Sequence, residues 1–126
     1  MKIPDVLKYT KDHEWIKIVN NEAIIGITEF AQKELGDIVF IEIETEGEDL
    51  AKGDTFGTIE AVKTVSDLFM PISGKVLTIN PKLSETPEIV NKDPYGDGWM
   101  IKISIKDLAE VNDLLTPEAY AKQINA

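Results

Sequence analysis

Short apolar runs separated by turn residues dominate the chain, and this pattern predicts a mainly β fold. Residues 14–19 and 22–27 are rich in β-branched side chains and flank Asn20-Asn21, which predicts a β-hairpin. We expect further strands wherever similar runs occur, at residues 38–44, 55–62, 65–70, 75–79 and 99–105.

The expected strand at 38–44 alternates apolar and polar positions only in part. Strict alternation would place its side chains on two faces, with Ile38, Phe40 and Glu42 on one and Val39, Ile41 and Ile43 on the other. The acidic stretch 44–49 that follows is expected to be a loop, as is the proline-punctuated region 81–94.

Capping signals predict three short helices, one early in the chain and two at its C-terminal end. Thr28 is a good N-cap and Gly36 a good C-terminal stop for a helix over 29–35. The pattern Asp107-x-x-Glu110 opens a helix that should run to residue 115. The dipeptide Thr116-Pro117 then starts a last helix to residue 124.

Length and composition indicate one domain that spans residues 1–126. The chain is 43% hydrophobic, which is enough for a core and argues against disorder. No apolar run approaches the roughly 18 residues of a membrane span. Residues 1–5 contain neither an apolar targeting region nor an Arg/Ser-rich amphipathic stretch, so we expect no targeting peptide and a cytoplasmic location.

The charge pattern disfavours nucleic acids and anionic lipids as partners. Thirteen basic residues, all lysine, stand against 23 acidic residues and give a net charge of −10. Without arginine the chain has no planar fork for phosphate or guanine. The acidic surface would instead be steered toward partners with basic faces, although acidity can also serve only to keep a protein dissolved.

The chain has little chemistry of its own. It contains no cysteine and a single histidine, His13, which excludes disulfides, thiol nucleophiles and multi-histidine metal sites. Any sulfur or redox chemistry would have to come from a cofactor. These counts argue against an enzyme and against a metal site, and we interpret His13 as structural.

One predicted hairpin has an unusual tip. A two-residue turn at Lys63-Thr64 would need positive φ, which favours asparagine, aspartate or glycine. Val62 and Val65 are expected to anchor the two strands on either side. The arrangement would present a lone amine at the apex of a rigid hairpin, the geometry required of an acylated swinging arm. The alternative is an ordinary surface lysine.

The segment around this lysine, GTIEAVKTVSDLFMPISG (57–74), resembles the lipoyl-attachment segment of the glycine cleavage H-protein family. Four other blocks agree in order: YTKDHEW (9–15), GITEFAQKELGD (26–37), NKDPYGDGWM (91–100) and LLTPE (114–118). Together they cover nearly the whole chain. One departure is Ala61, where the family usually has serine. We expect this change to affect contacts with a lipoylating enzyme slightly and carrier function little.

The resemblance implies a lipoyl/biotinyl-type barrel-sandwich hybrid with C-terminal helices, and lipoate in amide linkage to Lys63. It implies a non-catalytic carrier that moves the aminomethyl group and reducing equivalents of glycine between three enzymes of the glycine cleavage system. These partners are the decarboxylase, the aminomethyltransferase and the dihydrolipoyl dehydrogenase. A lipoylating enzyme would be a further partner, and the carrier is expected to be a monomer.

The same resemblance assigns roles to four other residues. Glu14 and Asp67 match acidic residues that hold the aminomethyl group in a surface cleft, although by themselves they would be interpreted as exposed charges. Glu60 and Gly74 match positions that lipoylating enzymes recognise. Glu60 lies three residues before Lys63 and Gly74 eleven residues after it. Gly74 also ends Pro71-Ile72-Ser73-Gly74, a turn expected to need glycine.

Several alternative functions stay open at this point. The same fold could serve as a lipoyl donor that hands lipoate to other carrier domains. A biotin carrier is disfavoured, because Val62 and Thr64 flank the lysine where biotin carriers have methionine. Two hypotheses come from other functional classes. One is an enzyme that uses Glu14, Asp67 and His13, and the other is an interaction module with an unmodified lysine.

Overall fold

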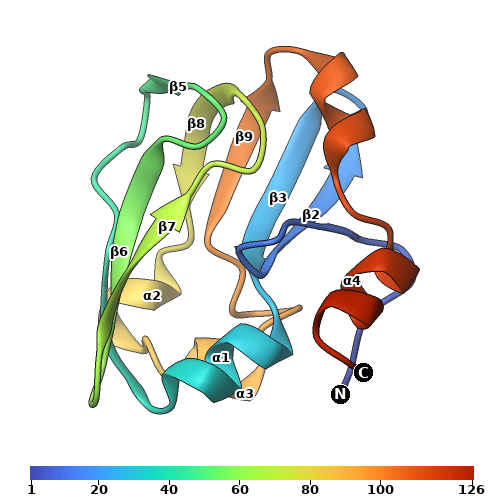
Figure 1. Ribbon diagram of the computed structural model, residues 1–126. Helices are drawn as coiled ribbons and strands as arrows, with labels where there is room; N and C mark the ends of the chain where they lie inside the picture. The colour runs from blue at the N-terminus through green and yellow to red at the C-terminus, as the bar shows by residue number, and fades with distance from the viewer.

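Two antiparallel sheets form the framework of the molecule (Figure 1). The computed structural model describes all residues 1–126. Six strands pair in the order β1-β2-β3-β9-β8-β5, with bounds β1 Lys8–Tyr9, β2 Glu14–Val19, β3 Glu22–Ile27, β5 Asp49–Leu50, β8 Gly74–Ile79 and β9 Ile101–Ile105. Three more pair in the order β4-β6-β7, with bounds β4 Ile38–Glu42, β6 Thr55–Ala61 and β7 Val65–Phe69. The prediction of a mainly β fold with short helices is confirmed.

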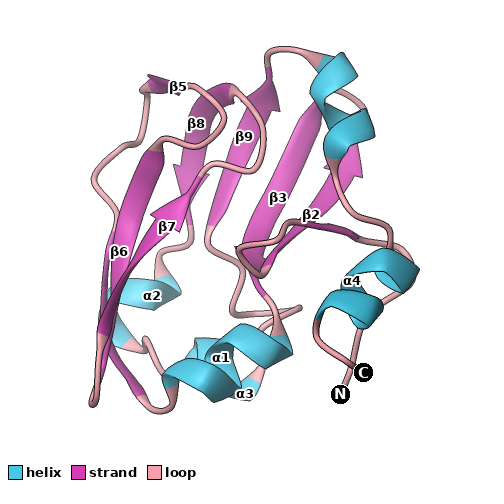
Figure 2. Cartoon of the chain, in the orientation of Figure 1, coloured by secondary structure: helices cyan, strands magenta, loops and turns pink.

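The helices are short and lie outside the sheets. They are α1 Glu29–Leu35, α2 Lys82–Glu85, α3 Ile89–Lys92, α4 Pro117–Gln123 and a 3-10 helix over Leu108–Asp113. Figure 2 shows α1, α2 and α3 gathered at the end of the molecule to which the β6–β7 hairpin points. No helix has the length and apolar character required to span a membrane.

The main core fills the space between the two sheets. It contains 17 buried apolar residues, drawn from both sheets and from the helices that close one end. Ile16, Ile25 and Ile103 contribute from the six-stranded sheet, and Ile41 and Ile59 from the three-stranded one. Burial of that many apolar side chains supplies the driving force that holds the two sheets face to face.

A smaller apolar cluster fixes the C-terminal helix against the six-stranded sheet. Leu7, Tyr9, Trp15 and Tyr120 are all buried there, and the rings of Tyr9 and Tyr120 stack with centroids 4.7 Å apart. The prediction of a final helix after Thr116 is confirmed, since the Thr116 side chain accepts a hydrogen bond from the backbone N–H of Ala119.

The early helix forms as the sequence predicts. Thr28 is its N-cap and accepts a hydrogen bond from the backbone N–H of Ala31. Gly36 ends it with φ +81°, a backbone conformation that favours glycine. The hairpin of β2 and β3 is also confirmed, with Asn20 at φ +58° in its turn.

Other local predictions need correction. Asp107 caps the next helix, but that helix is 3-10, and the Glu110 carboxylate accepts hydrogen bonds from the N–H and hydroxyl of Ser73 instead of completing a capping box. The region 81–94, expected to be a loop, contains α2 and α3. Pro81 stands just before α2, a position at which its missing N–H costs no helical hydrogen bond.

The expected alternation along β4 is wrong, because the strand contains a β-bulge. Ile38 pairs with Ala61 and Phe40 with Glu60, so Val39 is an extra residue without a partner. The bulge turns both Ile38 and Ile41 toward the core and leaves Val39 and Phe40 about half exposed.

The predicted strained turn at the β6–β7 tip is also wrong. β6 ends at Ala61 and β7 begins at Val65, so three residues connect the strands, and Glu60 rather than Val62 pairs with Val65. The backbone N–H of Ala61 donates to the carbonyl of Thr64 at 2.7 Å across this connection. Only His13, Asn20 and Asn125 among the non-glycine residues have positive φ. Val62 and Val65 do not anchor the strands through burial, since they are 75% and 64% exposed. The tip is held instead by a hydrogen bond from the Val62 N–H to the Asp37 carbonyl.

Candidate functional site

Lys63 lies at the tip of the β6–β7 hairpin with its side chain exposed to solvent. Its stem passes beside Gly36, because a Cβ added to Gly36 would lie 3.5 Å from Lys63 Cε and 3.9 Å from Nζ. The C-terminal end of a helix favours a nearby cation. None of the chain's three ion pairs includes Lys63. The amine is therefore presented on an ordered backbone without being held by a carboxylate.

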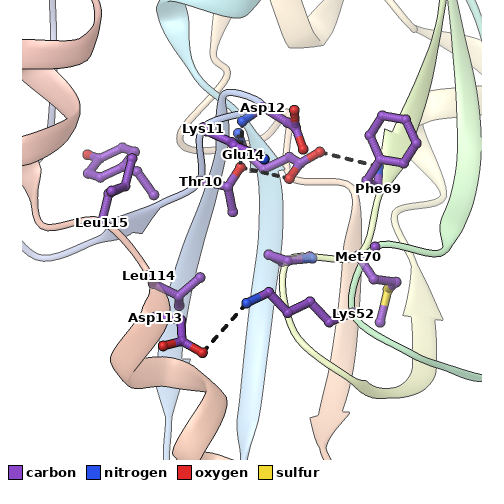
Figure 3. Close-up of a pocket in the computed structure, with 13 residues that line it drawn as sticks. Thr10, Lys11, Asp12, Glu14, Lys52, Phe69, Met70, Asp113, Leu114 and Leu115 are labelled. Atoms are coloured by element: carbon purple, nitrogen blue, oxygen red, sulfur yellow. Dashed lines mark hydrogen bonds and ion pairs between the residues drawn. The ribbon is translucent and has the colours of Figure 1, made fainter.

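A pocket of about 540 Å³ opens beside the free edge of β7 (Figure 3). β7 is an edge strand of its sheet, and the pocket lies between it and the start of the six-stranded sheet. Its apolar wall includes Phe69, Met70, Leu114 and Leu115. The cavity can therefore accept a flexible apolar group that reaches it along β7.

Glu14 supplies the buried charge of this pocket. It opens β2 and is only 3% exposed. Its Oε1 accepts a hydrogen bond from the Thr10 hydroxyl at 2.8 Å, and its Oε2 accepts one from the backbone N–H of Phe69 at 3.2 Å. Burial raises the pKa of Glu14 to about 7, although both hydrogen bonds oppose the rise. A cation that enters the pocket would stabilise the ionised carboxylate.

The neighbours of Glu14 include residues that sequence reasoning missed. The Thr10 hydroxyl accepts hydrogen bonds from the N–H groups of both Asp12 and Glu14, so it organises the turn that carries the carboxylate. Asp12 also lines the pocket, and Lys52 pairs with Asp113 at 3.7 Å on its far side. The only local signal for Thr10 was its position four residues before Glu14.

Asp67 does not line the pocket. It is exposed on β7 opposite Thr58, two residues nearer the hairpin tip than Phe69. The structure therefore separates the two acidic residues that the resemblance grouped together. Glu14 is buried beside Phe69, the last residue of β7, and Asp67 is exposed in the middle of that strand.

His13 belongs to a hydrogen-bonded group behind the pocket. Its Nδ1 lies 2.9 Å from the hydroxyl of Tyr120, which in turn lies 2.6 Å from Thr28 Oγ1. Its ring contacts Phe30 with centroids 4.8 Å apart, and burial lowers its pKa. His13 adopts φ +68° and links the turn before β2 to α4.

Glu60 and Gly74 lie in very different surroundings. Glu60 is exposed on β6, three residues before Lys63. Gly74 is buried as the first residue of β8. Figure 1 shows that β8 begins at the end of the molecule opposite the β6–β7 tip. The φ of Gly74 is not positive, so the predicted turn requirement is wrong. The position needs glycine because a Cβ would collide with the carbonyl oxygen of Ser104.

The comparison with known proteins is consistent along the whole chain. A profile of the family described as "Glycine cleavage H-protein" matches residues 7–126. The glycine cleavage system H protein of Bacteroides fragilis is 53% identical over 126 residues, which is 100% of both chains. That of Carboxydothermus hydrogenoformans is 55% identical and covers 95% of this chain and 92% of its own. The chain belongs to the glycine cleavage H-protein family.

A solved structure agrees with this assignment. The crystal structure of a glycine cleavage system H protein from Mycobacterium marinum matches with a TM-score of 0.88 and 35% identity, over 98% of this chain and 100% of that one. The fold is therefore the H-protein fold, a lipoyl-type barrel-sandwich hybrid. The predicted family and fold are both confirmed.

Membership of the family fixes the function. The chain is the lipoyl carrier of the glycine cleavage system, and it is a carrier component without catalytic activity of its own. Its cofactor is lipoate bound to a lysine, and its partners are the other proteins of that system. The lipoyl cofactor supplies the sulfur chemistry that the cysteine-free chain lacks.

The surroundings of Glu14 lead to a prediction about stability and pH. The carboxyl loses its proton near pH 4.5 in the unfolded chain and near 7 in the folded one, so between these values the folded state holds more protons. The free energy of unfolding should therefore fall as the pH rises through this window. Glu14→Gln has no such pH-dependent loss of stability. Above pH 7 the free energy of unfolding of the variant should therefore exceed that of the parent by up to about 3 kcal/mol. Urea unfolding of both proteins at pH 5 and pH 8 measures the difference, and a difference independent of pH would contradict the prediction.

Proposed function

We propose that Lys63 is the lysine that carries lipoate and that the arm folds back into the Glu14 pocket. The exposed amine at the hairpin tip supports the first part, since a modifying enzyme can reach it without unfolding the chain. The pocket beside β7 supports the second, because it combines an apolar wall with one buried carboxylate. The apolar wall suits the cofactor's ring, and the carboxylate suits the amine of the cargo.

The distances allow this proposal for the loaded arm. A lipoylated lysine side chain is about twelve bonds long as far as its first ring sulfur, the length of four extended residues, and so reaches about 14 Å. Phe69 lies six residues after Lys63, which is at most about 20 Å of extended chain. The distal sulfur and the aminomethyl group add four bonds, or roughly 5 Å, so a loaded arm laid along the free edge of β7 ends near the pocket.

The two acidic residues take different parts in the proposed parked state. Glu14 would accept hydrogen bonds from the ammonium of the aminomethyl group within the pocket, where low polarity strengthens a charge-assisted hydrogen bond. Asp67 would attract the cationic arm from the exposed side of β7, a weaker contribution because water screens it. This is how we propose the loaded arm is kept from water.

Glu60 and Gly74 are proposed to serve the lipoylating enzyme, as the family resemblance implies. The exposed carboxylate of Glu60 supports direct contact, since it lies on the same hairpin as Lys63. Gly74 is buried and distant, so its part in recognition would be to hold the backbone of β8 against β9. Asp67 and Glu60 both lie on the three-stranded sheet.

We further propose that residues 1–126 act as one domain, as a monomer, in the cytoplasm. The continuous core between the two sheets supports a single folding unit. Sedimentation equilibrium tests the monomer, and cell fractionation tests the location.

The proposal for Lys63 is tested by mass spectrometry of the protein isolated from lipoate-replete cells. One lipoyl increment in the intact mass, mapped to the peptide that contains Lys63, is the expected result. A lipoyl group on any other lysine would overturn the assignment. Lysines 52 and 75, the nearest in sequence on either side, serve as internal controls in the same digest.

Docking to the partner enzymes should depend on salt. The net charge of −10 should steer the chain toward basic faces, and such attraction weakens as the Debye length falls from about 30 Å at 0.01 M salt to about 10 Å at 0.1 M. We expect the apparent KM of the decarboxylase for this carrier to rise roughly tenfold over that range. A KM that does not change with ionic strength would show that charge does not guide the encounter.

A further inference from the structure

The outer face of the three-stranded sheet carries an unusual row of side chains. Phe40 of β4 pairs with Glu60 of β6, and Glu60 pairs with Val65 of β7. Directly paired residues project from the same face of a sheet with their Cβ atoms about 5 Å apart. All three are exposed, so one carboxylate stands between two apolar side chains on the surface.

This row belongs to a larger apolar area around the hairpin tip. Eight large apolar residues are exposed on the whole chain, and four of them lie here: Val39, Phe40, Val62 and Val65. The bulge in β4 produces two of these exposures, because it turns Val39 and Phe40 away from the core. Exposed apolar groups that gather in this way on a soluble domain indicate a contact surface.

The charges on the same face are all negative. The next row of the sheet pairs Glu42 with Thr58 and Thr58 with Asp67. β4, β6 and β7 contain no basic residue. The face therefore fits a partner surface that has an apolar centre and basic residues opposite Glu60 and Glu42.

We infer that this outer face, centred on the row Phe40–Glu60–Val65, is the surface on which the lipoylating enzyme docks. The inference rests on the proposed acylation of Lys63 and adds Phe40 and Val65 to the recognised residues. The short distance between the Lys63 amine and the backbone is the reason for choosing the lipoylating enzyme as this partner. The Nζ of an unmodified lysine lies only about 6 Å from its Cα. An active site that acylates it must come into contact with the hairpin and its neighbouring strand.

Enzymes that act on the far end of the lipoyl arm face no such requirement. Their reacting atoms lie about 14 Å from the backbone of Lys63, more than twice as far. They can work with the arm extended and leave the outer face of the sheet uncovered. The lipoylating enzyme, which attaches the arm, therefore depends most on contact with this face.

The test uses the unlipoylated full chain and a purified bacterial lipoate–protein ligase. Phe40→Thr and Val65→Thr each replace an exposed apolar side chain with a polar side chain that suits a β-strand, and Glu60→Gln removes the charge alone. Val19→Thr is the matched control, because Val19 is similarly exposed, at 51%, on β2 of the other sheet. Thermal unfolding of each variant confirms that the fold is kept.

Two measurements are made on each protein: the affinity for the ligase by calorimetry, and the initial rate of lipoyl addition by intact mass. Phe40→Thr and Glu60→Gln should each weaken ligase binding about tenfold and Val65→Thr severalfold, with Val19→Thr equal to the parent. Ligase affinities that match the parent in all three variants would overturn the inference. So would unchanged ligase binding combined with weaker binding of the lipoylated chain to the decarboxylase, since the face would then belong to that partner.

The same experiment separates this inference from the proposed site of lipoylation. Peptide mapping of the modified parent shows which lysine received the lipoyl group. A group found elsewhere than Lys63 refutes the site itself. A group on Lys63 together with unchanged affinities refutes only the docking face.

Discussion

Replacing Lys63 with arginine should abolish lipoylation and carrier activity while the fold stays intact. The guanidinium keeps the positive charge beside the end of α1, but it offers no primary amine that can be acylated under the same conditions. Lys63 is exposed and forms no ion pair, so the free energy of unfolding should change by no more than about 0.5 kcal/mol. Glycine decarboxylation in a reconstituted system is the measurement.

The matched control for this variant is Lys75→Arg, which changes another exposed lysine, on β8 of the other sheet. It should be lipoylated and active like the parent. Decarboxylation by Lys63→Arg above the level of a reaction without carrier would show that the arm is attached elsewhere.

The second large effect should be seen in the stability of the loaded arm. A charge-assisted hydrogen bond contributes roughly 1.5–3 kcal/mol, so removing the charge of Glu14 should speed loss of the aminomethyl group by about one to two orders of magnitude. Asp67→Asn should have a smaller effect, about two- to fivefold, because Asp67 is exposed and outside the pocket. Release of ammonia or formaldehyde from the purified loaded proteins, without the transferase, measures both rates.

The unloaded oxidised proteins provide the control, since a neutral ring gives the carboxylates no cation to bind. Glu14→Gln, Asp67→Asn and the parent should therefore be lipoylated alike and differ only when loaded. Equal decay rates of the three loaded proteins would mean that neither carboxylate holds the cargo, and the role of the pocket would have to be abandoned.

Features determined by near neighbours in the sequence could be predicted well. The helix α1 follows directly from its Thr28 cap and its Gly36 stop, because both act within one turn of backbone. The β2–β3 hairpin follows from two β-branched runs around Asn20. In each case the residues that decide the structure are adjacent to the structure they decide.

Features determined by distant parts of the chain could not be predicted in the same way. The pattern of residues 38–44 is equally compatible with a regular strand and a bulged one, and pairing with β6 decides between them. The shape of the hairpin tip depends on a hydrogen bond to Asp37, 25 positions before Val62. The local pattern around Gly74 predicts a turn, whereas the constraint on this residue comes from Ser104 on β9.

The candidate site, too, depends mainly on contacts between distant parts of the chain. Family resemblance, and not residue pattern, selected Glu14, because a charge at the start of a strand ordinarily lies in solvent. Its burial depends on β7, whose Phe69 supplies a backbone N–H from 55 positions away. Thr10 and Asp12 could not be recognised because, apart from the spacing of Thr10 from Glu14, nothing local distinguishes them from other polar residues in a turn.

The position of the pocket, at the far end of the strand that leaves the hairpin tip, also determines how tightly the pocket would need to bind the proposed lipoyl arm. A group tethered by a short flexible arm meets a site within its reach at an effective concentration in the millimolar range. An intrinsic dissociation constant near 1 mM, or about 4 kcal/mol of binding free energy, is then enough to keep the arm in the pocket for a large part of the time. Binding this weak also lets the arm leave quickly, because most differences in affinity appear in the dissociation rate. Shelter for the cargo and rapid delivery to successive enzymes are therefore compatible in a small rigid domain that needs no lid.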